Sequence, residues 1–137
     1  MQQVDPRSTR FAAAVTTLIL ALVLLTGNVW VLLAQAVVFA LGLAGAPPYG
    51  LLFRRFVRPR LGPPAEMEDA APLRFAQGVG LIFALAGVLG FAAQITPLAL
   101  GATAAALLAA FLNAAFGYCL GCEMYLIIRR LMPAATR

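Results

Sequence analysis

The sequence predicts an all-α membrane protein with four transmembrane helices, arranged as two repeated helical hairpins with short amphipathic segments at the cytoplasmic surface. Hydrophobic residues make up 63% of the chain and charged residues 11%, whereas about a quarter of the residues in soluble domains are charged. Two long apolar regions flank a polar centre. With 137 residues, the chain is expected to form a single integral-membrane domain, 1–137.

Turn and breaker residues divide the two apolar regions into helices. Gly27-Asn28 is a turn signal inside the first region, and Pro47-Pro48 ends it, because proline has no amide donor. Thr96-Pro97 divides the second region in the same way. The predicted helices span about 11–26, 28–46, 75–93 and 98–118, with a cytoplasmic loop at about 47–74.

The last apolar stretch is too long for one straight span. From residue 98 to residue 128 a continuous helix would extend roughly 46 Å, against a hydrocarbon core of about 30 Å. Gly117 and Gly121 are therefore the expected place for a break. Beyond it, residues 122–131 are expected to form a short interfacial segment.

The arginines predict the orientation of the chain. All ten precede the first helix, lie between the second and third, or follow the fourth, and the two opposite turns carry no charge. The positive-inside rule then places both termini and the central loop in the cytoplasm of a multi-pass cell-membrane protein. The arginines are Arg7, Arg10, Arg54, Arg55, Arg58, Arg60, Arg74, Arg129, Arg130 and Arg137.

An internal repeat is visible at two levels of similarity. Arg10-Phe11-Ala12 recurs as Arg74-Phe75-Ala76, at an offset of 64 residues. More loosely, Gly42 and Gly45 align with Cys119 and Cys122. A duplication would give a pseudo-twofold axis along the membrane normal. Chance similarity between alanine-rich helices is the alternative.

Cys119 and Cys122 are the only two cysteines of the chain, and they are three residues apart. Such a pair can cycle between dithiol and disulfide, carry sulfur as a persulfide, or bind copper(I). The alternative is that both cysteines merely pack as small apolar residues. In the cytoplasm the pair is expected to be reduced, with a disulfide only as a transient form.

Four arginines and two amides are further candidate site residues. Arg54 and Arg55 could converge with Arg129 and Arg130 beside the thiols and bind an anion or an acidic partner, whereas attraction to anionic lipids is the alternative. The amides of Gln35 and Asn113 lie within predicted spans. They are expected to hydrogen-bond between helices, with contact to a substrate as the alternative.

Composition also excludes several kinds of chemistry. The chain has no histidine and no lysine, so it can form neither a histidine-ligated metal site nor a Schiff base. We expect no metal, no cofactor and no nucleic-acid partner. No charged residue lies deep within a span, which argues against a proton-coupled pump. Whether the protein is an enzyme stays open.

Several motifs together resemble a known bacterial integral-membrane family, domain of unknown function 4395. They cover nearly the whole chain and include the segment from Pro48 to Arg54, Val57-Arg58-Pro59-Arg60-Leu61, Glu66-Met67-Glu68-Asp69 and the segment from Phe111 to Glu123. Genes of family members often lie near those of thioredoxin-like proteins and sulfurtransferases. The resemblance therefore implies thiol or sulfur chemistry, with such a protein as partner.

The cysteine pair also resembles that of quinone-coupled thiol oxidases. Those enzymes act at the outer face and use a second cysteine pair, which this chain lacks, so their mechanism is not carried over. The expected function is thiol–disulfide or sulfur-transfer chemistry at the cytoplasmic face through Cys119 and Cys122. The alternatives are a transporter for a small sulfur anion and a structural subunit without chemistry. A homo-oligomer formed through glycine- and alanine-rich faces is expected.

Overall fold

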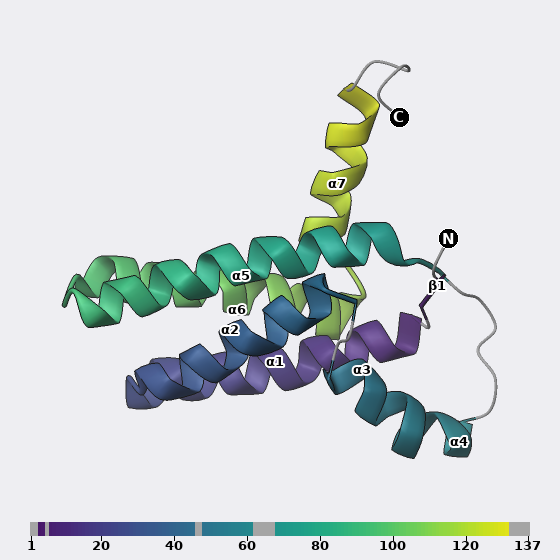
Figure 1. Ribbon diagram of the computed structural model, residues 1–137, viewed down its shortest axis with the longest axis horizontal. Coiled ribbons are helices and arrows are strands. Elements are labelled where there is room, and N and C mark those ends of the chain that lie inside the picture. The colour runs from purple at the N-terminus through teal and green to yellow at the C-terminus, as the bar shows by residue number, and fades with distance from the viewer. Residues whose placement is uncertain (1–2, 5, 46–47, 62–67, 132–137) are drawn as a thin grey trace.

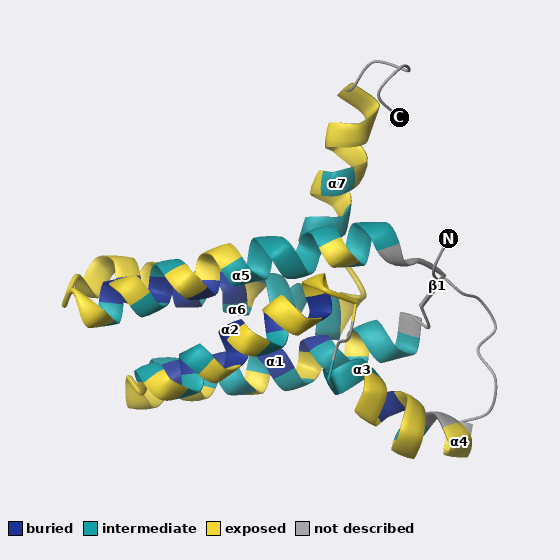
Figure 2. Cartoon of the chain, in the orientation of Figure 1, coloured by how far each residue is buried: buried dark blue, intermediate teal, exposed yellow. Residues whose placement is uncertain are grey.

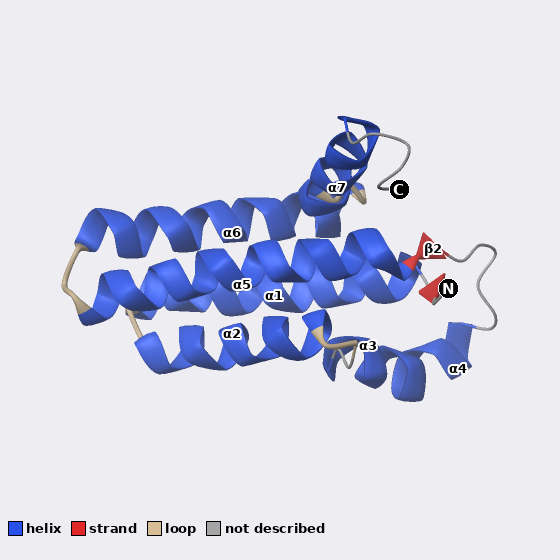
Figure 3. Ribbon diagram, turned by 45° about the horizontal axis from the view of Figure 1, so that its top comes forward, coloured by secondary structure: helices blue, strands red, loops and turns tan. Residues whose placement is uncertain are grey.

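The computed structural model describes the chain except for residues 1–2, 5, 46–47, 62–67 and 132–137. Long helices lie side by side in one bundle (Figures 1 and 3), which confirms the predicted all-α membrane class. These helices are α1 (Pro6–Thr26), α2 (Val29–Leu43), α5 (Ala70–Ala92) and α6 (Thr96–Phe116). Shorter elements are α3 (Pro48–Leu52), the π-helical turn η1 (Phe53–Val57), α4 (Arg58–Leu61) and α7 (Leu120–Leu131).

Local signals in the sequence place most of the helix ends. Gly27 has a positive φ of 67°, and the Asn28 side chain accepts a hydrogen bond from the amide of Trp30 at 2.9 Å. This cap starts α2. α2 ends three residues before the predicted limit of 46, because Gly45, with φ 97°, turns the chain out of the helix. Pro47, the predicted stop, lies outside the described residues.

The polar centre contains more helix than predicted. α5 begins at Ala70 rather than near residue 75, and α3, η1 and α4 lie where a loop was predicted between 47 and 74. Two short strands, β1 (Gln3–Val4) and β2 (Glu68–Asp69), pair antiparallel with Gln3 opposite Asp69. This pairing joins residues 3–4 to the segment that immediately precedes α5.

Three helices are long and apolar enough to cross a membrane: α1, α5 and α6. α2 has only 15 residues, fewer than the roughly 20 that a span needs. It provides a fourth span only together with Pro48–Val57, at a bend of 76°. Among the described residues, three helices can therefore cross a membrane, or four segments can if this bent pair is counted as one span.

The outer surface of the bundle is apolar, as expected for a protein surrounded by lipid. Leu18, Leu25 and Trp30 are 71%, 85% and 75% exposed, and exposed residues recur along the outside of every long helix (Figure 2). Described arginines lie at the end of the bundle where α1 begins and α6 ends (Figure 1). This distribution supports a multi-pass membrane protein, whereas the side on which the termini lie stays a prediction.

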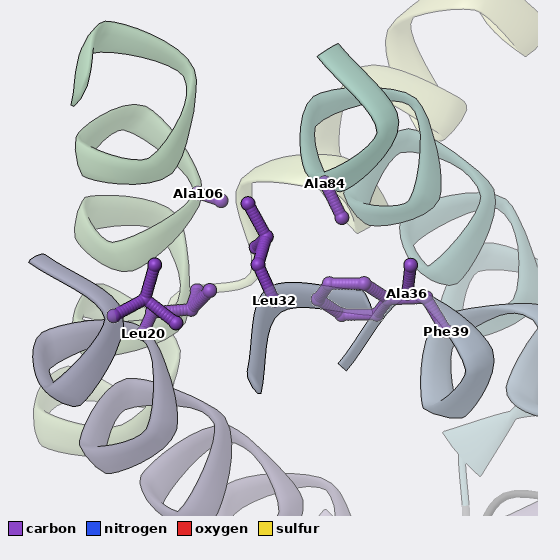
Figure 4. Close-up of a cluster of buried hydrophobic side chains, with 7 residues drawn as sticks. Leu20, Leu32, Ala36, Phe39, Ala84 and Ala106 are labelled. Carbon is purple, nitrogen blue, oxygen red and sulfur yellow. The ribbon is translucent and has the colours of Figure 1, made fainter. Parts of the chain in front are cut away.

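Four helices meet in a small central cluster. Leu20 of α1, Leu32 and Phe39 of α2 and alanines of α5 and α6 belong to one buried cluster (Figure 4). Two glycines of α5 make room for the larger side chains: a Cβ on Gly87 would lie 2.8 Å from Leu32, and one on Gly80 would lie 2.8 Å from Phe39. Small residues thus let the helices approach closely, as is usual in membrane bundles.

The repeat is visible in the contacts between the two halves. α1 packs mainly on α6 and α2 mainly on α5, so each hairpin interlocks with the other. Arg10 donates to the carbonyls of Ala114 and Ala115 at the end of α6, and Arg74 donates to the carbonyl of Leu43 at the end of α2. Arg10 and Arg74, which correspond in the repeat, therefore each bind carbonyl groups at the end of a long helix, α6 and α2 respectively.

The contacts also correct the alignment of the second halves of the repeat. Phe11 packs against Phe53 and Phe75 against Tyr125, each pair with tilted rings whose centroids are 5.7 Å apart. Phe53 and Tyr125 are 72 residues apart, and so are Gly45 and Gly117, which both follow a long helix with a positive φ. The pairing of Gly42 with Cys119 was wrong, because Gly42 lies inside α2 whereas Cys119 follows the end of α6. In the corrected register Cys122 matches Gly50, so the thiols belong to one half only.

Candidate functional site

Cys119 and Cys122 lie at the junction of α6 and α7. α6 ends at Gly117, whose left-handed φ of 70° lets its amide return to the carbonyl of Asn113, and α7 begins at Leu120. This is the break that the sequence predicted. A disulfide joins the two cysteines, with their Cα atoms 5.2 Å apart, so the structure contains the oxidised form of the pair.

Cys119 caps the first turn of α7. Its carbonyl accepts a hydrogen bond from the amide of Glu123 at 3.0 Å, and its Sγ accepts one from the amide of Cys122 at 3.1 Å. Helix amides here point at sulfur in the way that they usually point at a serine or aspartate oxygen. When the pair is reduced, this amide and the helix dipole favour a negative charge on Cys119.

An apolar cavity of about 350 Å³ lies on one side of Cys119. Toward the middle of the bundle its walls come from Val38, Phe39 and Phe83 and from alanines of α6. At the α7 end they include Tyr49, Gln77, Asn113 and Cys119 itself. We call this space the inner cavity, and it has a polar end at the sulfur and an apolar end within the bundle.

A second cavity, of about 450 Å³, also borders the disulfide. Both cysteines line it together with Arg10, Glu123 and the backbone turn at Gly117. We call it the outer pocket. Cys119, Asn113 and Thr9 line both spaces, so the disulfide borders two neighbouring cavities.

Thr9 and Asn113 offer polar atoms at this border. The Thr9 hydroxyl oxygen is buried and has no hydrogen-bond partner among the described residues. The Asn113 side chain makes no hydrogen bond there either, although it was predicted to bridge two helices. Gln35, the other amide, is 1% exposed and accepts a hydrogen bond from the Tyr49 hydroxyl of α3 at 2.9 Å.

Sequence reasoning missed Arg10 as the arginine beside the thiols. The signal was present, because Arg10 opens the repeated Arg-Phe-Ala motif, but its partners on α6 are more than 100 residues away. The four arginines that were predicted to converge are not brought together. Arg54 and Arg55 lie in η1, with Arg55 over the ring of Phe56 at 5.7 Å, whereas Arg129 and Arg130 lie at the far end of α7, which leaves the bundle in another direction (Figures 1 and 3).

The family assignment follows from a family model, domain of unknown function DUF4395, that matches residues 4–130. The match covers nearly all of the chain. The chain belongs to this family. No curated protein and no solved structure matches the sequence. In this DUF4395 protein, the disulfide and the two cavities beside it are the features that bear on function.

Arg10 and Arg74 provide a matched pair for testing the site in this DUF4395 protein. Arg10→Ala and Arg74→Ala should each lower stability by about 0.5–1 kcal/mol, because each removes charged hydrogen bonds to the last carbonyls of a helix. Only Arg10→Ala should also alter the reaction of the cysteines with a thiol reagent, by roughly threefold, because only Arg10 lines the outer pocket. Thermal unfolding in detergent and the rate of maleimide labelling after reduction measure the two effects. Equal labelling rates in both variants would remove Arg10 from the site.

Proposed function

We propose that this protein carries out thiol–disulfide exchange at the cytoplasmic face of the cell membrane, with Cys119 as the nucleophile and Cys122 as the resolving cysteine. The cap geometry of Cys119 is the observation that carries the proposal: its Sγ accepts the amide of Cys122 at the start of α7. A sulfur in this position is a good nucleophile in the thiolate form and a good leaving group in a disulfide.

The outer pocket supports exchange with a water-soluble thiol. It is lined by both cysteines, Arg10 and Glu123, so a polar substrate bound in it would lie next to the disulfide. Arg10 adds positive charge next to Cys119. This charge favours a substrate thiol that carries a carboxylate, such as a small peptide thiol or an acidic segment of a thioredoxin-like partner.

The exchange proceeds in two balanced steps. A substrate thiolate attacks Sγ of Cys119, the bond between the two cysteines breaks, and Cys122 leaves as a thiolate. A second substrate thiolate then attacks the substrate sulfur of the mixed disulfide, and Cys119 leaves as a thiolate. Two substrate thiols become one disulfide, and the pair gains the two electrons and, after protonation, two protons. The reverse sequence reduces a substrate disulfide.

A glutathione titration tests the proposal. The purified full chain in lipid nanodiscs is equilibrated with mixtures of reduced and oxidised glutathione, quenched with acid, and labelled with a maleimide that shifts its mass. Both thiols should disappear together, with a slope of about 30 mV per tenfold change, as expected of a two-electron couple. Thiols that stay unreactive in the folded protein, or that titrate separately as glutathione adducts, would rule out this function.

The same labelling tests the side of the membrane. After treatment of cells with a permeant reductant, an impermeant maleimide should label the pair only once the cells are lysed, because the positive-inside rule places α7 in the cytoplasm. Labelling in intact cells would place the disulfide outside. A sulfane-sulfur carrier, the second chemistry expected of this pair, would instead retain one extra sulfur atom on Cys119 after incubation with thiosulfate or a persulfide.

A further inference from the structure

We propose that α7 lies on the surface of the bilayer and binds anionic phospholipids there. One face of the helix is embedded among the acyl chains, and Arg129 and Arg130 bind the lipid phosphates. This contact goes beyond the proposed thiol exchange and does not depend on it. It gives a binding partner to an amphipathic helix that the bundle leaves largely exposed.

The direction of α7 places it parallel to the membrane plane. α5 and α6 are long and apolar enough to cross a membrane, and Figure 1 shows α7 running crosswise to them from the end of the bundle. A helix that runs crosswise to transmembrane helices lies along the membrane surface. The 12 residues of α7 are also too few for a span, which needs about 20.

The residues of α7 divide into an apolar face and a polar face. One stripe is apolar along its whole length and consists of Leu120, Met124, Ile127 and Leu131. These residues follow one another at intervals of three or four, so they lie on one face of the helix. We call this face the apolar stripe. The opposite face carries Cys122, Leu126 and Arg129 at the same intervals. This division is typical of helices that lie in the membrane interface.

The apolar stripe faces the interior of the membrane. Its first two residues, Leu120 and Met124, line the inner cavity, which extends into the bundle as far as Phe39 of α2. The stripe then continues beyond the bundle as Ile127 and Leu131, which are 53% and 80% exposed. Because the outer surface of the bundle is surrounded by lipid, the neighbouring acyl chains are in position to cover both side chains.

The opposite face of α7 carries positive charge. Arg129 and Arg130 are both exposed, and the acidic residue of the helix, Glu123, lies two turns earlier. Guanidinium groups bind phosphate oxygens well, and each arginine near an anionic bilayer raises the affinity about fivefold. The same side of the helix contributes Cys122 and Leu126 to the outer pocket. Contact between the stripe and the lipid therefore leaves this pocket on the side away from the acyl chains.

Bimane fluorescence tests the position of the stripe. Ile127→Cys or, as the matched control, Leu126→Cys is made in the full chain with both native cysteines replaced by serine, labelled with bimane and placed in nanodiscs. Brominated acyl chains, but not acrylamide in water, should quench the label at 127, and the label at 126 should show the reverse. The same pattern at both positions would overturn the membrane contact. So would a label at 127 that neither quencher reaches, because a second copy would then cover the stripe.

The label at 127 also measures the preference for anionic lipid. In nanodiscs of phosphatidylcholine and phosphatidylglycerol, with one of the two brominated, phosphatidylglycerol should be enriched at the label at least about fivefold. Arg129→Gln combined with Arg130→Gln should abolish this preference. The corresponding double substitution to lysine should retain it, which also shows that α7 still folds on the surface.

Arg54→Gln combined with Arg55→Gln is the matched control for charge. It removes the same charge from η1, which leaves the bundle in another direction (Figure 1), and it should not change the lipid preference at residue 127. Equal quenching by the two lipids when Arg129 and Arg130 are present would overturn the anionic-lipid site. An equal loss of preference in the η1 variant would also overturn it, because the net charge of the protein would then account for the effect.

Discussion

A Cys122→Ser variant should react with oxidised glutathione at least about tenfold faster than a Cys119→Ser variant. In Cys122→Ser the remaining thiol keeps its place at the cap of α7, and the amide of residue 122 can still donate to it as it does to Cys119 Sγ at 3.1 Å. In Cys119→Ser the remaining thiol belongs to the third residue of α7, and the serine hydroxyl takes the amide of residue 122.

The measurement is the rate of mixed-disulfide formation, read by mass after quenching in acid. The two variants should react at equal rates once they are unfolded in denaturant, which separates the effect of position from the intrinsic reactivity of a cysteine. The opposite order of rates would make Cys122 the nucleophile, and equal rates would show that the cap has no influence.

A partner-trapping experiment extends this result to the cell. Cys122→Ser should accumulate a mixed disulfide with its physiological partner, because no resolving thiol remains to release it. The Cys119→Ser variant is the control, and the mixed disulfides that it forms define the background. The proposed thioredoxin-like partner would be identified in this complex by mass.

The membrane class and several helix ends could be predicted from sequence because they depend on local properties. The low charge content indicates that the chain folds in a membrane. Gly27 and Gly117 adopt a positive φ that ends a helix, whatever the rest of the fold. The end of α2 was placed too late because the prediction relied on the prolines at 47 and 48. Gly45 precedes them, and its positive φ already turns the chain out of the helix. The early start of α5 at Ala70 has no such marker.

The site could be predicted only in part, because its other components come from distant segments. The cysteine spacing is local, and so is the break that puts Cys119 at the start of α7. The position of Arg10 beside the disulfide depends instead on α1 packing against α6 rather than against its own hairpin partner. The two cavities depend on the same interlocking of the halves. Hydrophobic periodicity does not specify which helices become neighbours, so neither feature could be read from the sequence.

Replacing Gly121 by alanine should lower stability by about 1–3 kcal/mol, the usual cost of overpacking. Alanine is the better helix former by about 1 kcal/mol, so propensity alone predicts the opposite sign. The close approach of α7 to α5 decides the outcome, because a Cβ on Gly121 would lie 2.6 Å from both Cα and Cβ of Ala76. Gly101→Ala is the matched control: nothing lies within 4 Å of its Cβ, and the variant should be unchanged or more stable in thermal unfolding.

Gly121→Ala also tests whether the chemistry of the disulfide depends on the docking of α7 against α5. Cys119 and Cys122 belong to the same turn of α7, so their disulfide and cap move together if the helix shifts, and glutathione exchange should stay within about twofold of wild type. A larger loss of exchange would mean that α7 must be docked against α5 for any chemistry at the disulfide. Equal unfolding temperatures for Gly121→Ala and Gly101→Ala would show instead that α7 is not held against α5.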